Sequence, residues 1–218
     1  MILSLDTTQP RASVGLYAPD GSILFEAEYD AMNQHGESLL PALSALFVQH
    51  GIVLDSLTGV AVCVGPGSFN GVRVGLSTAA ALRLALGVPV FGASSFARER
   101  VVAPVGSACL VCLEAGRGEV YAELTSADGE NVHGALVCVQ SAVEELAAGI
   151  SDLLRLPREQ TNDEGSAPAQ PRARMLFAAT RGLSPMLEID AVYVRPPDIT
   201  SSRASQLPVT PHQSTRPA

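Results

Sequence analysis

The most regular pattern of apolar and polar positions in the chain lies in residues 58–92. Gly59 to Val64 is a short, valine-rich apolar run, which is typical of a buried strand. A glycine–proline–glycine turn ends this run, and the residues from Gly71 to Leu86 are rich in alanine and leucine, which favour a helix. Gly87 favours a helix end, and another apolar run follows from Val88 to Phe91. The pattern predicts two parallel strands joined by a helical crossover.

Three shorter apolar runs precede this stretch and predict strands at Ile2–Leu5, Ala12–Ala18 and Ser22–Tyr29. The next segment, Gln34 to Gly51, has apolar residues at helical spacing, namely Leu39, Leu40, Leu43, Leu46 and Phe47. Pro41 is compatible with this helix near its first turn or at a bend. Residues 1–103 are therefore expected to form one α/β lobe.

Small residues form one face of the predicted crossover helix. Gly71, Gly75 and Ala79 recur every four residues, so they lie on the same side. A glycine inside a helix costs about 1 kcal/mol relative to alanine, so a close backbone contact should offset it. Two contacts would serve: the helix packs tightly on its own sheet, or a helix of a partner packs on this face. Ser68 and Asn70 are both candidates for the helix cap.

The loop before this helix reads GPGSFNGVRVG and resembles the signature of the TsaB (YeaZ) family, proteins of bacterial tRNA threonylcarbamoyladenosine synthesis. Further matches are LSLDTT at the N-terminus, HGESLLPAL, GRGEVYAEL and YVRPPDIT, and together they frame most of the chain. Asn70 stands where the family commonly has threonine, and Glu114 stands where many relatives have aspartate. The signature loop comprises Gly65, Pro66, Gly67, Ser68, Phe69, Asn70, Gly71 and Arg73.

The order of three strands, a helix and a crossover suggests a lobe of the actin-like ATPase (ribonuclease H-like) fold, and the resemblance implies the same two-lobed fold. In that superfamily the first hairpin holds nucleotide phosphates and carries Asp, Gly and Thr. Here Asp6, Thr7 and Thr8 are present without the glycine, so we expect a degenerate phosphate loop whose threonines satisfy the turn. Neither GxGxxG nor GxxxxGK[ST] occurs, and no cofactor is expected.

Residues 104–200 predict a reduced second lobe. Its expected strands are Ala108–Leu113, Glu119–Thr125, Val132–Val139, Met175–Ala178 and Ala191–Val194. Helices are expected at Ser94–Val102, with Arg98, Glu99 and Arg100 exposed, and from Ser141 to about Leu154. The polar, proline-bearing composition of residues 157–174 predicts a flexible insertion, and that of residues 201–218 predicts a disordered tail.

Composition and charge narrow the partners. The chain has 218 residues, is 47% hydrophobic and 17% charged, and therefore has ample apolar residues for a core. Its net charge is −8, and no basic patch is visible, so direct binding of tRNA by this chain alone is not expected. The start of the chain reads as a strand and no apolar run is long enough to span a membrane, so we expect a cytoplasmic protein.

Metal-binding and catalytic sets are missing from the sequence pattern. Cys109 and Cys112 have a CxxC spacing, but on a strand they point to opposite faces, and thiols in a reducing compartment are the expectation. The four histidines form no pair at metal-ligand spacing and no serine–histidine–aspartate set: His35, His50, His133 and His212. Asp6, Glu114 and Glu119 lie near strand ends, and their spacing leaves open whether they converge. We therefore assign no catalytic residue and no metal ligand.

The resemblance implies a non-catalytic scaffold. It would pair with a TsaD-like catalytic subunit and a TsaE-like ATPase for threonylcarbamoyl transfer to adenosine 37 of tRNAs that read codons starting with A. It would reach tRNA only through that complex and form a homodimer in the partner's absence. The two helices of the first lobe are implied to be the partner surface, with interface residues Leu39, Leu43, Leu46, Gly71, Gly75 and Ala79. The alternatives are a peptidase-like or small kinase-like enzyme of the same superfamily, or a plain homodimer.

Overall fold

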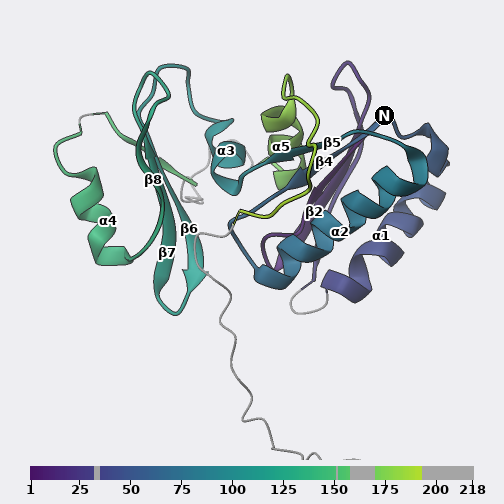
Figure 1. The fold of residues 1–218 in the computed structure, drawn as a ribbon, viewed down its shortest axis with the longest axis horizontal. Coiled ribbons are helices and arrows are strands. Elements are labelled where there is room, and N and C mark those ends of the chain that lie inside the picture. The colour runs from purple at the N-terminus through teal and green to yellow at the C-terminus, as the bar shows by residue number, and fades with distance from the viewer. Residues whose placement is uncertain (32–34, 151, 158–169, 193–218) are drawn as a thin grey trace, which may run out of the picture.

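A computed structural model describes residues 1–31, 35–150, 152–157 and 170–192, and these residues form two sheets with helices packed on them (Figure 1). The five-stranded sheet has the order β3-β2-β1-β4-β5, and the four-stranded sheet has the order β8-β7-β6-β9. The α/β class and the actin-like arrangement predicted from the sequence are confirmed.

The five-stranded sheet consists of β1 (Ile2–Asp6), β2 (Arg11–Tyr17), β3 (Ile23–Asp30), β4 (Gly59–Cys63) and β5 (Val90–Ala93). The first three strands pair antiparallel, whereas β1, β4 and β5 pair parallel. All five lie within two residues of the strands predicted from the apolar runs. The parallel strands β4 and β5 are connected through the predicted crossover helix.

Helices α1 (His35–Gln49) and α2 (Phe69–Leu86) cover one face of this sheet, and α5 (Arg172–Thr180) covers the other (Figure 1). Ser68 caps α2, because its Oγ accepts a hydrogen bond from Gly71 N at 3.2 Å. Gly87 ends the helix in the left-handed conformation, with φ of 69°. Pro41 lies inside α1, on its exposed side.

The four-stranded sheet consists of β6 (Cys109–Gly116), β7 (Glu119–Thr125), β8 (Asn131–Val139) and the short β9 (Leu154–Leu156). Helix α4 (Gln140–Ala147) covers one face, and Phe96 of the short helix α3 (Ser95–Arg100) packs on the other. Cys109 belongs to the Phe96 side and Cys112 to the α4 side, so the CxxC pair does point to opposite faces. All four cysteines are free.

The C-terminal part of the described chain differs from the prediction. Met175–Ala178 lies within helix α5 and is not a strand, because a run of four apolar residues suits either element. The helix expected from Ser141 to Leu154 ends at Ala147. Ala191 and Val192 are not in a strand.

Helix α5 and the residues after it also pack on the first sheet and not on the second. Ser4 Oγ donates to Ala173 O at 2.8 Å, Met186 N donates to Val90 O, and Val192 N donates to Val64 O. The first lobe is therefore built from residues 1–93 and 172–192, with the second sheet inserted between them. This corrects the assignment of residues 172–192 to the second lobe.

Residues 158–169 and 193–218 lie outside the described residues, so the flexible insertion and the disordered tail stay predictions. Residues 172–174, which were assigned to that insertion, are helical. In the part of the chain that the structure describes, no helix is long and apolar enough to cross a membrane.

Candidate functional site

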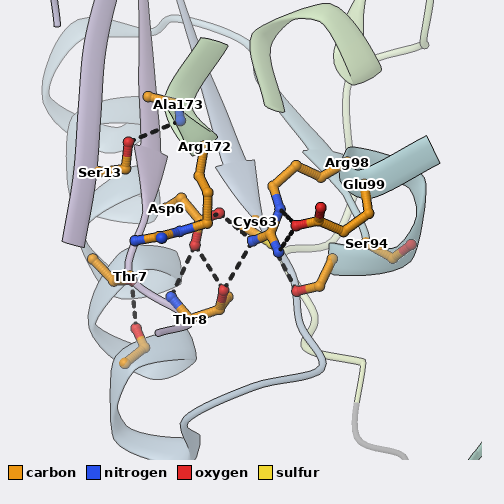
Figure 2. Close-up of polar contacts among 12 residues, drawn as sticks. Asp6, Thr7, Thr8, Ser13, Cys63, Ser94, Arg98, Glu99, Arg172 and Ala173 are labelled. Carbon is orange, nitrogen blue, oxygen red and sulfur yellow. Dashed lines mark hydrogen bonds and ion pairs between the residues drawn. The ribbon is translucent and has the colours of Figure 1, made fainter. Parts of the chain in front are cut away.

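The turn between β1 and β2 contains Asp6, Thr7 and Thr8, the residues that we expect from the sequence to form a degenerate phosphate loop. Asp6 is fully buried at the end of β1 (Figure 2). Thr8 donates to Asp6 Oδ1 through both its backbone N, at 3.0 Å, and its Oγ1, at 2.7 Å. One oxygen of the carboxylate is thus bound by the turn itself, in the manner of an Asx turn.

The other carboxylate oxygen is bound by an arginine from a distant element. Arg98 of α3 points into the turn, and its Nη1 contacts Asp6 Oδ2 and also donates to Thr8 Oγ1 at 3.2 Å (Figure 2). Its Nε and Nη2 donate to Glu99 Oε1 at 3.1 and 2.7 Å. Arg98 is 1% exposed and Glu99 is 6% exposed. The expectation that both would be solvent-exposed is therefore wrong.

The charges in this cluster balance. Burial by itself would raise the pKa of Asp6, but Arg98, Arg172 and the two Thr8 hydrogen bonds together hold it below the ordinary value of 3.8. Arg172 Nε lies 3.9 Å from Asp6 Oδ2. The Asp6 carboxylate raises the pKa of Arg98 despite the burial of the guanidinium. Asp6 is consequently a carboxylate held by a permanent internal cation.

The signature loop closes on the same turn from the opposite side. Ser68 N donates to Thr8 O at 2.8 Å, and Thr7 Oγ1 donates to Gly71 O at 2.6 Å. A Cβ at Gly67 would lie 2.5 Å from Thr8 O, and one at Gly71 would overlap Thr7 O. Glycine is needed at both positions because the two backbones touch. The amide of Ser68 thus binds the protein's own carbonyl.

The rest of the signature loop is held by α3 and by the C-terminal segment. Ser95 donates from its N to Gly65 O at 2.8 Å and from its Oγ to Pro66 O at 2.7 Å. Gly65 has a φ of 96°, and a Cβ there would lie 2.9 Å from Val192 O. The two outward-facing side chains differ: Arg73 lies over the ring of Phe69, whereas Asn70 is exposed.

The small-residue face of α2 packs on its own sheet, which was one of the two alternatives. A Cβ added at Gly75 would lie 2.6 Å from Thr7 Oγ1 and 3.5 Å from Val62 Cγ2. Ala79 is fully buried. On α1, the predicted interface leucines also belong to the core: Leu39 and Leu43 are buried and Leu46 is partly buried. Five of the six predicted interface residues are buried within the chain and Leu46 is partly buried, so they do not form an exposed ridge, and their role in a partner interface stays a prediction.

The outer faces of α1 and α2 expose large apolar side chains. Leu40 is 60% exposed, Val48 is 79% exposed and Leu84 is 89% exposed. The exposed residues between them are mostly small and uncharged: Pro41, Ser44, Ala45, Ser77, Ala81 and Ala85. A groove of about 250 Å³ runs between the helices, lined by Gly36, Leu39, Leu40, Arg73, Val74, Ser77 and Thr78. We call these outer faces and the groove the helix-pair surface.

The remaining candidate groups do not assemble into a catalytic set. Glu114 is exposed and faces Val120 across the β6–β7 hairpin, while Asp6 is held by Arg98 in the other sheet. His50 stacks on Phe25, and His133 is exposed on β8. Within the described residues, no group of three His, Cys, Asp or Glu side chains could hold a metal ion. His212 and the side chain of His35 lie outside the described part.

Sequence reasoning missed the most buried charged cluster of the described chain. Arg98 and Glu99 sit in an Arg-Glu-Arg run that has the composition of a solvated helix face. A usable signal was that this segment is short and lies between two predicted buried strands. Most residues of such a segment stay close to a sheet. The partner of Arg98 is Asp6, which lies 92 positions away in the sequence. No local pattern could therefore indicate this pair.

Comparisons with known proteins agree with this architecture. The family model for TsaD, tRNA N6-adenosine threonylcarbamoyltransferase, matches residues 29–184. Among curated proteins, TsaB of Escherichia coli, a tRNA threonylcarbamoyladenosine biosynthesis protein, is 31% identical over 123 residues, covering 55% of this chain and 52% of its own length. A tRNA N6-adenosine threonylcarbamoyltransferase of Nitrosospira multiformis is 33% identical over 107 residues, covering 42% and 31%. The chain spans about half the length of the TsaB relatives that it matches.

Two solved structures from Pseudomonas aeruginosa share the fold at 24% identity. A protein described as similar to the peptidase YeaZ has a TM-score of 0.65, covering 89% of this chain and 99% of its own. YeaZ itself has a TM-score of 0.52, covering 63% and 67%.

Proposed function

The chain belongs to the TsaD family of tRNA N6-adenosine threonylcarbamoyltransferases, its curated relatives include TsaB proteins, and on that premise we propose that it is a non-catalytic subunit of tRNA threonylcarbamoyladenosine synthesis. It binds a TsaD-like catalytic subunit through the helix-pair surface. In the absence of that partner it binds a second copy of itself through the same surface. A TsaE-like ATPase and tRNA join through the complex.

The observation that carries this proposal is the helix-pair surface. Surface helices of soluble proteins usually present charged residues to water. Within α1, Glu37 is the one Asp, Glu, Lys or Arg residue, and it lies in the first turn. On α2, the exposed residues Ser77 and Ala81 carry no charge, with Arg73 before them and Arg83 after them. Exposed apolar patches of this kind mark protein–protein contacts.

Small residues at Ser77, Ala81 and Ala85 favour a helical occupant, because they let a second pair of helices approach closely. Leu40 and Leu84 supply larger apolar contacts at the two helices. A relative of the same fold would present the corresponding pair, which would give a four-helix contact. The net charge of −8 argues against a direct grip on tRNA and so favours contact with nucleic acid through the partner.

The non-catalytic role is supported by the state of the hairpin. The Asp6 carboxylate is taken by Arg98, Thr8 and Arg172, and the loop amide of Ser68 is taken by Thr8. A nucleotide would need the same groups free, the carboxylate for its metal ion and the amide for a phosphate oxygen. No observation favours the peptidase-like or kinase-like alternative, so neither is proposed.

The test measures binding of the chain to a TsaD-like protein from the same organism. Leu40→Glu and Leu84→Glu should each weaken binding at least tenfold, or about 1.4 kcal/mol, since each buries a charge in an apolar contact. Val105→Glu is the matched control, because Val105 is fully exposed in the loop before β6. The isolated variants should melt at the wild-type temperature. Unchanged binding by both helix variants would refute the proposed surface.

A further inference from the structure

We propose that the β1–β2 turn is a cation site which the chain fills with its own Arg98, and that α3, by carrying this arginine, works as an ionic clasp between the two sheets. The site takes a planar guanidinium cation. This inference is independent of the partner proposed above, because the helix-pair surface lies on the opposite face of the first sheet.

The donors and acceptors around Arg98 match a guanidinium on its open sides. Asp6 Oδ2 and Thr8 Oγ1 face Nη1, and Glu99 Oε1 faces both Nε and Nη2. Three nitrogens of one planar guanidinium are thus bound from two sides, which a compact ammonium ion could not reproduce. With Arg98 removed, Asp6 and Thr8 of the turn and Glu99 of α3 would leave two buried carboxylates and a hydroxyl, an acceptor set for a free cation of the same shape.

The opposite end of α3 holds the second sheet. Arg100 Nη1 contacts Glu123 of β7, a residue that is 9% exposed. Phe96, also on α3, packs against Val111 and Leu156 of the second sheet. One six-residue helix thus donates an arginine to each sheet.

The two contacts depend on each other because the helix is short. Arg98 is enclosed on all sides, so we expect its departure from Asp6 to displace the short helix that also carries Phe96 and Arg100. Ser95 adds a third attachment, through Gly65 and Pro66 of the signature loop. Filling the cation site and docking the second sheet are therefore one event.

The test is chemical rescue of Arg98→Ala in the full chain. The variant should melt about 10 °C below wild type, because it leaves buried carboxylates without their cation. Guanidinium chloride at about 20 mM, far too dilute to denature, should restore several degrees of this loss. Sodium chloride at equal ionic strength should not, and wild type should respond to neither salt.

Hydrogen exchange gives the second readout. In Arg98→Ala, exchange should speed up in α3 and β6 while β1 and β4 keep their protection, and guanidinium should reverse the change. Asp6→Asn/Arg98→Ala is the control and should lose most of the rescue, because the main acceptor is gone. The proposal is overturned if guanidinium has no more effect than sodium chloride, or if Mg²⁺ rescues in its place. If Arg98→Ala does not fold, Arg98→Gln takes its place, because glutamine is uncharged and shorter than arginine, and the same rescue is expected.

Discussion

The pair of Asp6 and Arg98 is a contact whose single and double substitutions should behave differently. Both side chains are buried, so removing one leaves the other charge without compensation, at a cost of about 3–5 kcal/mol. Replacing the whole charged set by uncharged residues of similar volume removes that cost. Because Glu99 shares Arg98, a neutral version of the cluster must include it.

The low pKa of Asp6 makes the stability of the protein sensitive to acid. The unfolded chain has the ordinary value of 3.8 and the folded chain a lower one, so the unfolded state binds more protons as the pH falls. The stabilisation is therefore complete above this value and is lost as the pH falls toward the folded-state pKa. Urea unfolding from about pH 7 to about pH 3 should show a steeper loss in wild type than in Asp6→Asn/Arg98→Met/Glu99→Gln. Equal slopes would contradict the ionic pairing.

At the scale of elements, α1 and α2 each have two faces with separate roles. The inner faces supply the core of the first sheet, including Leu39, Leu43 and Ala79. The outer faces carry Leu40, Val48 and Leu84 and are left open. A change on one face should thus alter stability and a change on the other should alter binding.

Gly75→Leu tests the inner face. The new side chain would enter the space of Thr7 and Val62, so we expect overpacking to lower the stability by about 1–3 kcal/mol, or roughly 2–12 °C in Tm. Ala81→Leu is the matched control, since Ala81 is exposed on the same helix, α2. Thermal melting of the isolated chain reads out both. A Gly75→Leu variant as stable as wild type would mean that α2 does not lie tight on its sheet.

An element or contact could be predicted from the sequence where it depends on residues close together in the chain. The strands, α1, α2 and the Gly87 cap follow from apolar periodicity and turn chemistry, which act over a few residues. Helix α5 was predicted as a strand because four consecutive apolar residues, Met175 to Ala178, fit a strand as well as a helix. The Arg98 cluster was not predicted because tertiary packing, and not the neighbouring sequence, brings Asp6 to Arg98.

For the whole molecule, the decisive feature is that the predicted phosphate loop is occupied by the chain's own groups. Arg98 takes the carboxylate from one side, and the signature loop covers the turn from the other. The pure chain should hydrolyse ATP no faster than a buffer blank in a phosphate-release assay. Steady turnover that disappears in Asp6→Ala would show that the site opens in solution.

Because α5 packs on the first sheet, that sheet cannot be covered on both faces until α5 has been translated. The strands of that sheet leave the ribosome early, but the helix that covers Cys63 and Ala93 is encoded after the whole second sheet. At about 5–20 residues per second, the stretch between β5 and α5 takes about 4–16 s to synthesise. During that time the face of the sheet that α5 later covers is exposed. We expect a chaperone to bind the nascent chain in this interval.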